Sequence, residues 1–413
     1  MSGPSFDNAS VTRRYGLLSA LLAAAFLAPP PAFAAERTPL ALRLGRALAV
    51  PHVARSRSAA LAVDLVTGKQ VYAQNLRLPL IPASNEKLPV TYACLLALGP
   101  SYRFATEVLG EGEREGPVWR GDVVLKGYGD PTLSTFDLLQ LASQLYAQGI
   151  RRVAGRVVGD ESFFDARRIA PGWKPWFFIN ESPPLSALTV DRARFRGRIT
   201  RTPALAAAMS FRAALLRAHI SVAGRALAGR ADEAAMPLAS IESAALTEIL
   251  RFMDHESDNF TAEILLKQLG ATLSFQGTTA TGAAVVRQLL QEQDIPLAGV
   301  RIVDGSGLSR LDRLTAGTLV EMLRATWLDE DLREILLASL PVAGRSGTLE
   351  RRMRGSAAAG RVRAKTGTLN EASALSGYVK RRFAFSVIQN GSPVSTYWAR
   401  LAQDRFAAVL ATQ

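Results

Sequence analysis

The chain has 413 residues, 48% of them hydrophobic and 21% charged, which is typical of a globular protein of two or three domains. Its formal net charge of +13 could indicate a nucleic-acid partner, but the basic residues are scattered and no recognition motif accompanies them, so no nucleic acid is expected. Two interpretations of this charge remain: the basic surface is simply solvated, or it is weakly attracted to an anionic cell wall. The single cysteine, Cys94, excludes an intramolecular disulfide and is expected to fill the core.

The N-terminus has the three parts of a secretory signal: Arg13 and Arg14, an apolar stretch over 17–27, and Ala32-Phe33-Ala34. Residues 1–34 are therefore predicted to be a signal peptide that is cleaved after Ala34. No later stretch is long and apolar enough to span a bilayer, so no transmembrane anchor is expected after signal removal. We expect an exported protein, periplasmic, and soluble or loosely associated with the wall.

After the predicted signal, the sequence pattern first indicates two strands and a helix and then a series of short strands. Two strands are predicted at 59–64 and 70–73, and a helix is predicted from Ser84 to just before Gly99-Pro100. Residues 101–239 then read as an inserted β-rich domain. Its expected elements are short strands at 104–108, 123–126 and 153–158 and a helix near 136–148.

Helical patterns return near Leu246 and lead to a second series of elements. An amphipathic helix is predicted over 260–269, and the chain should close with a group of strands followed by a helix. The remaining elements are helices at 279–293 and 315–328, strands at 361–366, 374–379 and 383–389, and a final helix from about 395.

Three short motifs occur along these elements: Ser84-Asn85-Glu86-Lys87, Ser257-Asp258-Asn259 and Lys365-Thr366-Gly367. Of the 49 basic residues 42 are arginine and seven are lysine, and two of the seven lysines lie in the motifs. Arginine does not lose its proton in a protein, whereas burial or a nearby cation can make a lysine neutral. The motifs therefore contain the two residues best suited to act as bases.

The motif residues together describe nucleophilic catalysis by a serine. Ser84 and Lys87 are three apart, on one helical face, so neutral Lys87 could accept the proton of Ser84 as that residue attacks. Lys365 would depress the pKa of Lys87 and could bind a substrate carboxylate. Ser257 could pass a proton to a leaving amine, and Asn259 could accept a hydrogen bond from Lys87 and donate one to a substrate carbonyl.

The strand after Lys365 is the expected substrate-binding segment. The backbone N–H groups of Ser84 and Thr368 could hold the oxyanion, and Thr366, Gly367 and Thr368 could bind a peptide by edge pairing. No metal or other cofactor is implied. Each motif also has a purely structural interpretation, as a helix cap or a strand end. A histidine-based hydrolase is the chemical rival, but His255 is its one interesting candidate and no Gly-x-Ser-x-Gly elbow is present.

These motifs, in this order, are those of β-lactamases and penicillin-binding proteins. With its wider context the chain resembles the class C penicillin-binding proteins, D-alanyl-D-alanine carboxypeptidases that also act as D-alanyl-D-alanine endopeptidases on cell-wall cross-links. That context is Pro82 to Leu88, Gly129-Asp130-Pro131-Thr132-Leu133, Ala262-Glu263 after the second motif, Asp304 to Arg310, and Thr368 after the third.

The resemblance implies an α+β fold: a transpeptidase-like, β-lactamase-like domain with a five-stranded antiparallel sheet flanked by helices. Residues 35–100 and 240–413 would form this catalytic domain, interrupted by the insertion at 101–239. It also implies a serine DD-peptidase that acylates Ser84, with peptidoglycan stem peptides as substrate and β-lactam antibiotics as inhibitors. Carboxypeptidase action on D-Ala-D-Ala termini is expected, with endopeptidase action on cross-links in addition.

The spacing of the first two motifs favours a class C penicillin-binding protein over a simple β-lactamase, because 170 positions separate Lys87 from Ser257. No asparagine lies between Phe260 and Ala364, so the Glu-x-x-Leu-Asn segment of class A β-lactamases is absent there, and fast penicillin hydrolysis is not expected. The insertion is short for the family, so a nested inner domain should be reduced or missing. A β-lactamase or esterase with the same site and a non-catalytic penicillin-sensing or wall-binding protein remain alternatives.

Within the insertion, an aromatic segment precedes an acid. The resemblance places Trp173, Trp176 and Glu181, with Phe177 and Phe178, near the far end of the stem peptide. An acid beside aromatic rings could hold the free amine of a diaminopimelate side chain. Packing at the domain boundary is an equally weighted alternative.

Overall fold

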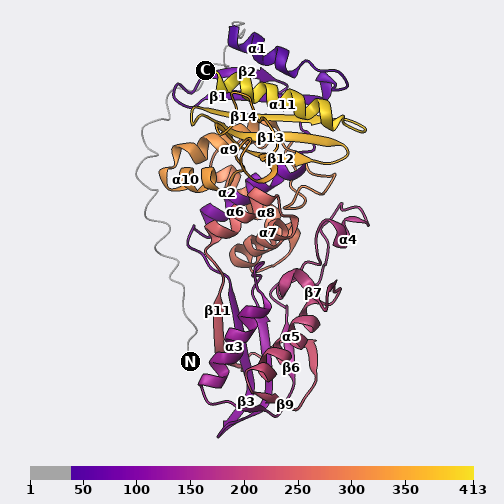
Figure 1. The fold of residues 1–413 in the computed structure, drawn as a ribbon, viewed down its shortest axis with the longest axis vertical. Helices are drawn as coiled ribbons and strands as arrows, with labels where there is room; N and C mark the ends of the chain where they lie inside the picture. The colour runs from indigo at the N-terminus through magenta and orange to yellow at the C-terminus, as the bar shows by residue number, and fades with distance from the viewer. Residues whose placement is uncertain (1–38) are drawn as a thin grey trace. The chain divides into compact units, whose positions relative to one another are not determined.

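The computed structural model describes residues 39–413, so the predicted signal at 1–34 lies outside the described residues. Figure 1 shows two large sheets made from separate stretches of this chain. The first is antiparallel and has the order β12-β13-β14-β1-β2, which confirms the predicted five-stranded sheet. Its strands are β1 (Ser58–Asp64), β2 (Gln70–Gln74), β12 (Val362–Thr368), β13 (Ala372–Val379) and β14 (Phe383–Asn390).

Both faces of this sheet are buried. Side chains alternate along β14, so that Phe383 and Phe385 enter one apolar cluster and Ala384 and Ile388 enter the other. Helices α1 and α11 cover the first face, and α2 and α6 to α10 lie on the other side. The helices are α1 (Pro39–Leu48), α2 (Lys87–Ala97), α6 (Leu246–Glu256), α7 (Asn259–Ser274), α8 (Thr279–Glu292), α9 (Ala316–Leu328), α10 (Glu330–Ser339) and α11 (Thr396–Ala411).

The helices around the first sheet differ from the sequence prediction in their character and in their number. Helix α7 is not amphipathic: every residue from Phe260 to Ala271 is buried, because α2, α8 and the insertion surround it. Helices α1 and α10 are absent from the prediction. Among the described residues, no helix combines the length and the apolarity needed to cross a membrane.

The second sheet lies within residues 105–242 and has seven strands of mixed direction. Its main order is β10-β6-β4-β3-β11, with β5 paired to β4 and β9 paired to β5. Strands β3, β4 and β11 are antiparallel neighbours, whereas β6, β10, β5 and β9 join by parallel pairing. The strands are β3 (Ala105–Glu115), β4 (Val118–Gly127), β5 (Arg152–Val153), β6 (Val157–Asp160), β9 (Ser221–Val222), β10 (Ala226–Gly229) and β11 (Met236–Glu242).

Helices α3 (Thr135–Ala147) and α5 (Pro203–Arg217) pack against this sheet. The sequence prediction missed α5, although Pro203 stands at its first turn, where proline is favoured. The predicted strand at 153–158 is two strands, β5 and β6, separated at 154–156. The shorter elements are α4 (Phe177–Asn180), β7 (Arg194–Phe195), β8 (Arg198–Ile199), η1 (Arg55–Arg57), η2 (Ala83–Glu86), η3 (Asp191–Ala193) and η4 (Gly347–Leu349).

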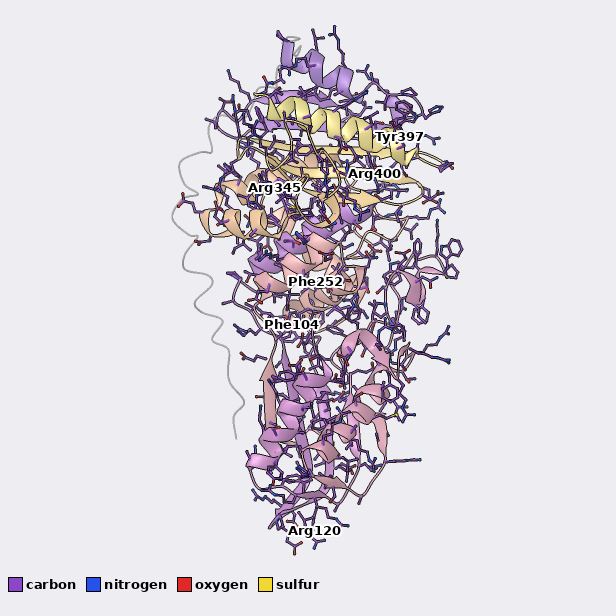
Figure 2. The ribbon with its side chains drawn as sticks, viewed as in Figure 1. Phe104, Arg120, Phe252, Arg345, Tyr397 and Arg400 are labelled. Atoms are coloured by element: carbon purple, nitrogen blue, oxygen red, sulfur yellow. The ribbon has the colours of Figure 1, made fainter. Side chains whose placement is uncertain are left out.

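The two ends of the insertion meet at one point. Phe104 donates its backbone N–H to Ser243 Oγ at 3.0 Å, and Ser243 returns its N–H to the Phe104 carbonyl at 2.9 Å. Phe104, labelled in Figure 2, therefore marks the place where the chain passes from the part that holds the first sheet to the part that holds the second. We propose that residues 101–239 form a domain of their own, because the apolar cluster from Val108 to Ala239 draws its buried members from this range alone.

Candidate active site

Ser84 lies in the 3₁₀ turn η2, which leads into α2 at Lys87. The predicted helix thus starts three residues later than expected, yet Lys87 Nζ still lies 3.2 Å from Ser84 Oγ. Ala83 has a φ of 47°, and its carbonyl is approached so closely by Gly307 that a Cβ there would lie 1.9 Å from the oxygen. Ser84 is half-buried and Lys87 is 0% exposed, so the hydroxyl can be reached while the amine beside it is shielded from water.

Ser257 and Asn259 lie at the junction of α6 and α7. Ser257 ends α6 in the left-handed conformation, with φ 61° and ψ 40°, a region that glycine adopts at far less cost. Asp258 caps α7 by accepting the N–H of Thr261 at 2.8 Å. The junction directs Asn259 Oδ1 to Lys87 Nζ, at 2.8 Å.

Lys365 enters from β12, a strand at one end of the first sheet. It is 0% exposed, and its Nζ donates to Ser257 Oγ at 2.7 Å and to the Thr366 carbonyl at 3.1 Å. Asn85 donates its side-chain amide to the Lys365 carbonyl at 3.0 Å, which fastens the strand to the turn carrying Ser84. The structure therefore brings Ser84, Lys87, Ser257, Asn259 and Lys365 together from three distant segments.

Burial dominates the electrostatics of both lysines. It lowers the pKa of Lys87 to about 8, and nearby carboxylates, Asp304 foremost, oppose that shift. It lowers the pKa of Lys365 to about 7, where the charge on Lys87 acts in the same direction and Asp254 opposes it. Lys365 had been expected to depress the pKa of Lys87; instead burial is the main cause, and the repulsion between the two acts on Lys365.

A buried loop over 304–309 provides a third contact to Lys87, which sequence reasoning did not find. The Ser306 carbonyl accepts from Lys87 Nζ at 2.6 Å. Glu263 Oε1 holds the loop by accepting the N–H groups of Gly305 and Ser306 at 3.0 and 2.8 Å. The sequence showed Asp304 to Arg310 as part of a family pattern, but a contact through a backbone carbonyl has no residue signature.

The aromatic segment of the insertion is divided between core and surface. Trp173 is 8% exposed and donates its indole N–H to Asp304 Oδ2 at 2.8 Å, so it packs at the boundary and does not face solvent. Phe177 is buried in the same apolar cluster. Trp176 is 60% exposed, and Glu181 is exposed with its backbone carbonyl accepting the side-chain amide of Asn259 at 3.0 Å. The packing alternative thus describes Trp173 and Phe177, while Trp176 and Glu181 remain accessible.

Further contacts surround the end of β12. Thr366 donates its hydroxyl to Thr348 Oγ1 at 2.8 Å, and exposed Thr368 accepts from Arg400 Nη2 at 3.3 Å. Arg400 comes from α11 and is labelled in Figure 2. Gly367 passes so close to the turn with Ser84 that a Cβ there would lie 2.7 Å from the Pro82 carbonyl oxygen. No sequence motif pointed to Arg400.

The rival nucleophiles and bases lie elsewhere. His255 Nδ1 is 2.9 Å from Glu256 Oε1, on the side chain next to it in sequence. Cys94 is fully buried, and burial raises the pKa of its thiol, so it is inert as a nucleophile. Within residues 39–413, no group of three or more His, Cys, Asp or Glu side chains is arranged to hold a metal ion.

Comparison with known proteins decides the family. The model of the D-Ala-D-Ala carboxypeptidase 3 (S13) family matches residues 40–202 and 195–413. The chain belongs to this family. It is thus a serine-type D-Ala-D-Ala carboxypeptidase of the class C penicillin-binding type, and the resemblance inferred from the sequence is confirmed.

Relatives extend over most of the chain. The D-alanyl-D-alanine carboxypeptidase of Actinomadura sp. (strain R39) is 34% identical over 427 residues, covering 81% of this chain and 78% of its own. Carboxypeptidase DacB of Mycolicibacterium smegmatis is 35% identical over 428 residues, covering 93% and 89%.

The fold also has a solved counterpart. Penicillin binding protein 4 (dacB) from Haemophilus influenzae superposes with a TM-score of 0.78 at 22% identity, over 90% of this S13 chain and 98% of its own. The same protein complexed with a novel β-lactam gives a TM-score of 0.73 at 21% identity, with the same coverage. The predicted α+β fold is therefore confirmed.

Proposed function

We propose that this S13 enzyme removes the terminal D-alanine from peptidoglycan stem peptides through an acyl-enzyme on Ser84. The observation that carries the proposal is the buried, easily neutralised amine of Lys87, 3.2 Å from a half-buried serine hydroxyl. A serine without histidine needs such a base, and an ordinary surface lysine would be protonated at neutral pH.

The steps follow from the contacts. Ser84 Oγ attacks the carbonyl of the penultimate D-alanine while its proton moves to Lys87. Ser257, held by Lys365 at 2.7 Å, passes its hydroxyl proton to the departing amine and takes a proton back from the lysine pair, which has received the one from Ser84. The peptide bond thus breaks, and D-alanine leaves with its carboxylate near Lys365. Water then hydrolyses the ester and restores the Ser84 hydroxyl. The backbone N–H groups of Ser84 and Thr368 are the proposed oxyanion donors.

Substrate binding is assigned to the edge of β12 and the rim beside it. We propose that Thr366, Gly367 and Thr368 pair with the peptide backbone. On the edge of β12 away from β13, the described residues form a bridge between Val342 and Arg363, but none of them forms a strand beside 366–368. Trp176 and Glu181 are exposed and could meet the far end of the stem peptide, whereas Trp173 would support the site from beneath through Asp304.

A β-lactam would acylate the same serine and leave slowly, because the class A segment that positions deacylating water is missing from the sequence. In support, the Haemophilus influenzae protein of the same fold has been solved with a β-lactam. We also propose cleavage of cross-links and an exported, periplasmic location. Digestion of purified cross-linked muropeptides, with the products identified, tests the endopeptidase part.

The decisive experiment compares Ser84→Ala with Ser143→Ala, an exposed serine on α3. We expect Ser84→Ala to lose both D-alanine release from a D-Ala-D-Ala peptide and labelling by a fluorescent penicillin, while Ser143→Ala retains both. Full D-alanine release by Ser84→Ala would refute the mechanism. Failure of the folded wild type to label would favour a non-catalytic protein, and faster turnover of penicillin than of the peptide would favour a β-lactamase.

A further inference from the structure

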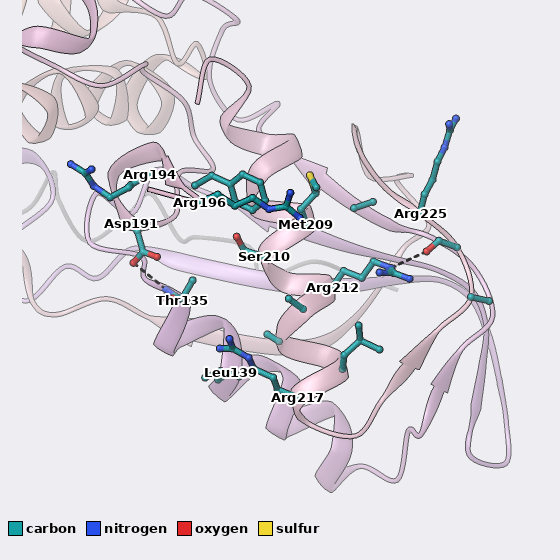
Figure 3. A pocket seen from close by; sticks show the side chains of 17 residues that line it. Thr135, Leu139, Asp191, Arg194, Arg196, Met209, Ser210, Arg212, Arg217 and Arg225 are labelled. Carbon is teal, nitrogen blue, oxygen red and sulfur yellow. Dashed lines mark hydrogen bonds between the residues drawn. The ribbon is translucent and has the colours of Figure 1, made fainter. Parts of the chain in front are cut away.

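A second candidate site lies in the inserted region, where a cavity of about 870 Å³ is lined by none of the three motifs. Figure 3 shows that its walls come from the start of α3, the β7–β8 hairpin, α5 and the turn before β10. This volume is in the range of small-molecule sites in proteins. Its most unusual feature is its charged lining, which consists of Arg194, Arg196, Arg212, Arg217 and Arg225.

The charge of this cavity is not balanced by protein groups. Asp191 is the one acid in the lining, and its Oδ1 already accepts the backbone N–H of Thr135 at 3.2 Å. Among the described residues, none of the five guanidinium groups forms an ion pair with a carboxylate. Elsewhere on the insertion arginines do pair, as Arg156 does with Asp122 at 2.6 Å. Five like charges around one hollow repel one another and raise the local concentration of anions.

Two of the arginines are held in place. Arg212 donates Nε to the Gly224 carbonyl at 3.1 Å and Nη2 to the Val222 carbonyl at 3.3 Å. A guanidinium has five N–H groups, so roughly three remain for a ligand. The Arg196 guanidinium lies 5.3 Å from the ring centroid of Phe195. These contacts reduce the entropy that the two side chains would lose on binding an anion.

The wall that carries Arg194 and Arg196 is anchored as well. Just before it, Arg192 forms a two-bond ion pair with Asp258, at 2.6 and 3.1 Å. Asp191, Arg192 and Ala193 have φ values of 47°, 56° and 59°, a run of left-handed residues that persists only where the surroundings hold it. The cavity is therefore a preformed feature, bounded by a segment tied to the second motif.

We propose that this cavity binds an anion carrying two or more phosphate groups. The planar fork of arginine matches phosphate oxygens with paired hydrogen bonds. Figure 3 shows Arg196 and Arg212 in the middle of the lining, while the side chains of Arg194 and Arg225 extend outward from its opposite ends, so a ligand with charges spaced along it can reach more of them than a single charge can. Leu139 and Met209 add apolar lining, where the part of the ligand between its phosphates can lie.

Calorimetric titration of the full chain at constant ionic strength tests this site, with inorganic tripolyphosphate, orthophosphate and citrate as probes. Tripolyphosphate should bind at least tenfold more tightly than orthophosphate or citrate. The double variant Arg196→Gln/Arg212→Gln should weaken tripolyphosphate binding at least tenfold. The matched control Arg55→Gln/Arg57→Gln removes the same charge from exposed residues of η1 and should change it less than twofold.

Each result of these titrations either supports or overturns the proposed phosphate site. Absence of tripolyphosphate binding, or equal weakening in both double variants, overturns the site, since overall charge would then explain the result. Citrate binding as tightly as tripolyphosphate overturns the choice of phosphate. A cooperative urea unfolding transition reports that each variant is folded. Because neither this check nor the binding measurement uses Ser84, the test is independent of the proposed peptidase mechanism.

Discussion

The pH dependence of acylation tests the two buried lysines. Burial lowers the pKa of Lys87 to about 8 and that of Lys365 to about 7. The proposed mechanism needs Lys87 without its proton, so that it can accept the proton of Ser84, and Lys365 with its proton, so that it can bind a carboxylate. Because the two amines interact, they titrate as a pair, and the active form has lost one of its two protons.

The acylation rate should fall on both sides of the pH optimum, because the active form needs one protonated and one neutral lysine. Below about pH 7 both lysines are protonated and Lys87 is not a base; above about pH 8 both are neutral and the carboxylate loses its partner. Lys87 has the higher pKa, so it holds the proton in most molecules of the one-proton form, and the active arrangement is the minor tautomer of that form. The ratio of the two tautomers does not change with pH, so activity follows the one-proton form, which for these apparent pKa values peaks near pH ~7.5 and falls about twentyfold two pH units to either side. We therefore expect a bell-shaped profile.

The assay is the second-order rate constant for labelling by a fluorescent penicillin between about pH 5.5 and 9.5 at constant ionic strength, a range in which a carboxylate stays ionised. Burial also raises the pKa of Glu263 to about 8, so Glu263→Gln is the matched control: both limbs should remain in it. A flat profile, or a rate that rises only near the ordinary lysine pKa of about 10.4, would refute the assignment of Lys87 as base.

Three substitutions give further predictions. Lys87→Arg, which cannot supply a neutral base, should slow penicillin acylation by roughly 10²–10⁴-fold in stopped-flow labelling, and retention of the wild-type rate would contradict the mechanism. Trp173→Phe removes a hydrogen bond to Asp304 and should lower the free energy of unfolding in urea by about 2 kcal/mol. The KM for the peptide substrate should change less than twofold. A large rise in KM at unchanged stability would instead make Trp173 a substrate contact. Arg192→Gln breaks the partly exposed ion pair with Asp258 and should cost about 1 kcal/mol of unfolding free energy, an effect that 1 M salt should mimic in the wild type.

The sheet and the motifs were predictable because their signals are local. Strands β13 and β14 are buried on both faces and read as mainly apolar runs broken by few polar residues, within two residues of the predicted bounds. The catalytic candidates were recognisable because Ser84, Lys87 and Lys365 combine unusual residue types with a fixed order along the chain. That these residues lie close together in space followed from the fold of the family that they indicate.

What the sequence could not provide depends on tertiary contacts. Helix α7 looked amphipathic because its sequence contains polar residues such as Glu263 and Lys267, but both of these are buried in specific interactions. Trp173 reads the same in a sequence whether it faces a ligand or the core. The Ser306 carbonyl is a backbone atom, so its bond to Lys87 has no side-chain pattern to find.

The acids around Lys87 explain how a lysine in acidic surroundings can still act as a base. Ionised carboxylates would keep it protonated, and Asp304 and Glu263 both act in that direction. Burial, however, raises the pKa of Glu263 to about 8 and that of Glu86 well above its usual range. Both carboxyl oxygens of Glu86 lack a hydrogen-bond partner among the described residues, and an unpaired buried carboxyl is stable only as the neutral acid. Asp304 accepts hydrogen bonds from two backbone N–H groups, a hydroxyl and the indole of Trp173, so its oxygens are engaged by donors other than Lys87. Burial thus neutralises two of the acids and the amine together, and Lys87 is left able to accept the serine proton.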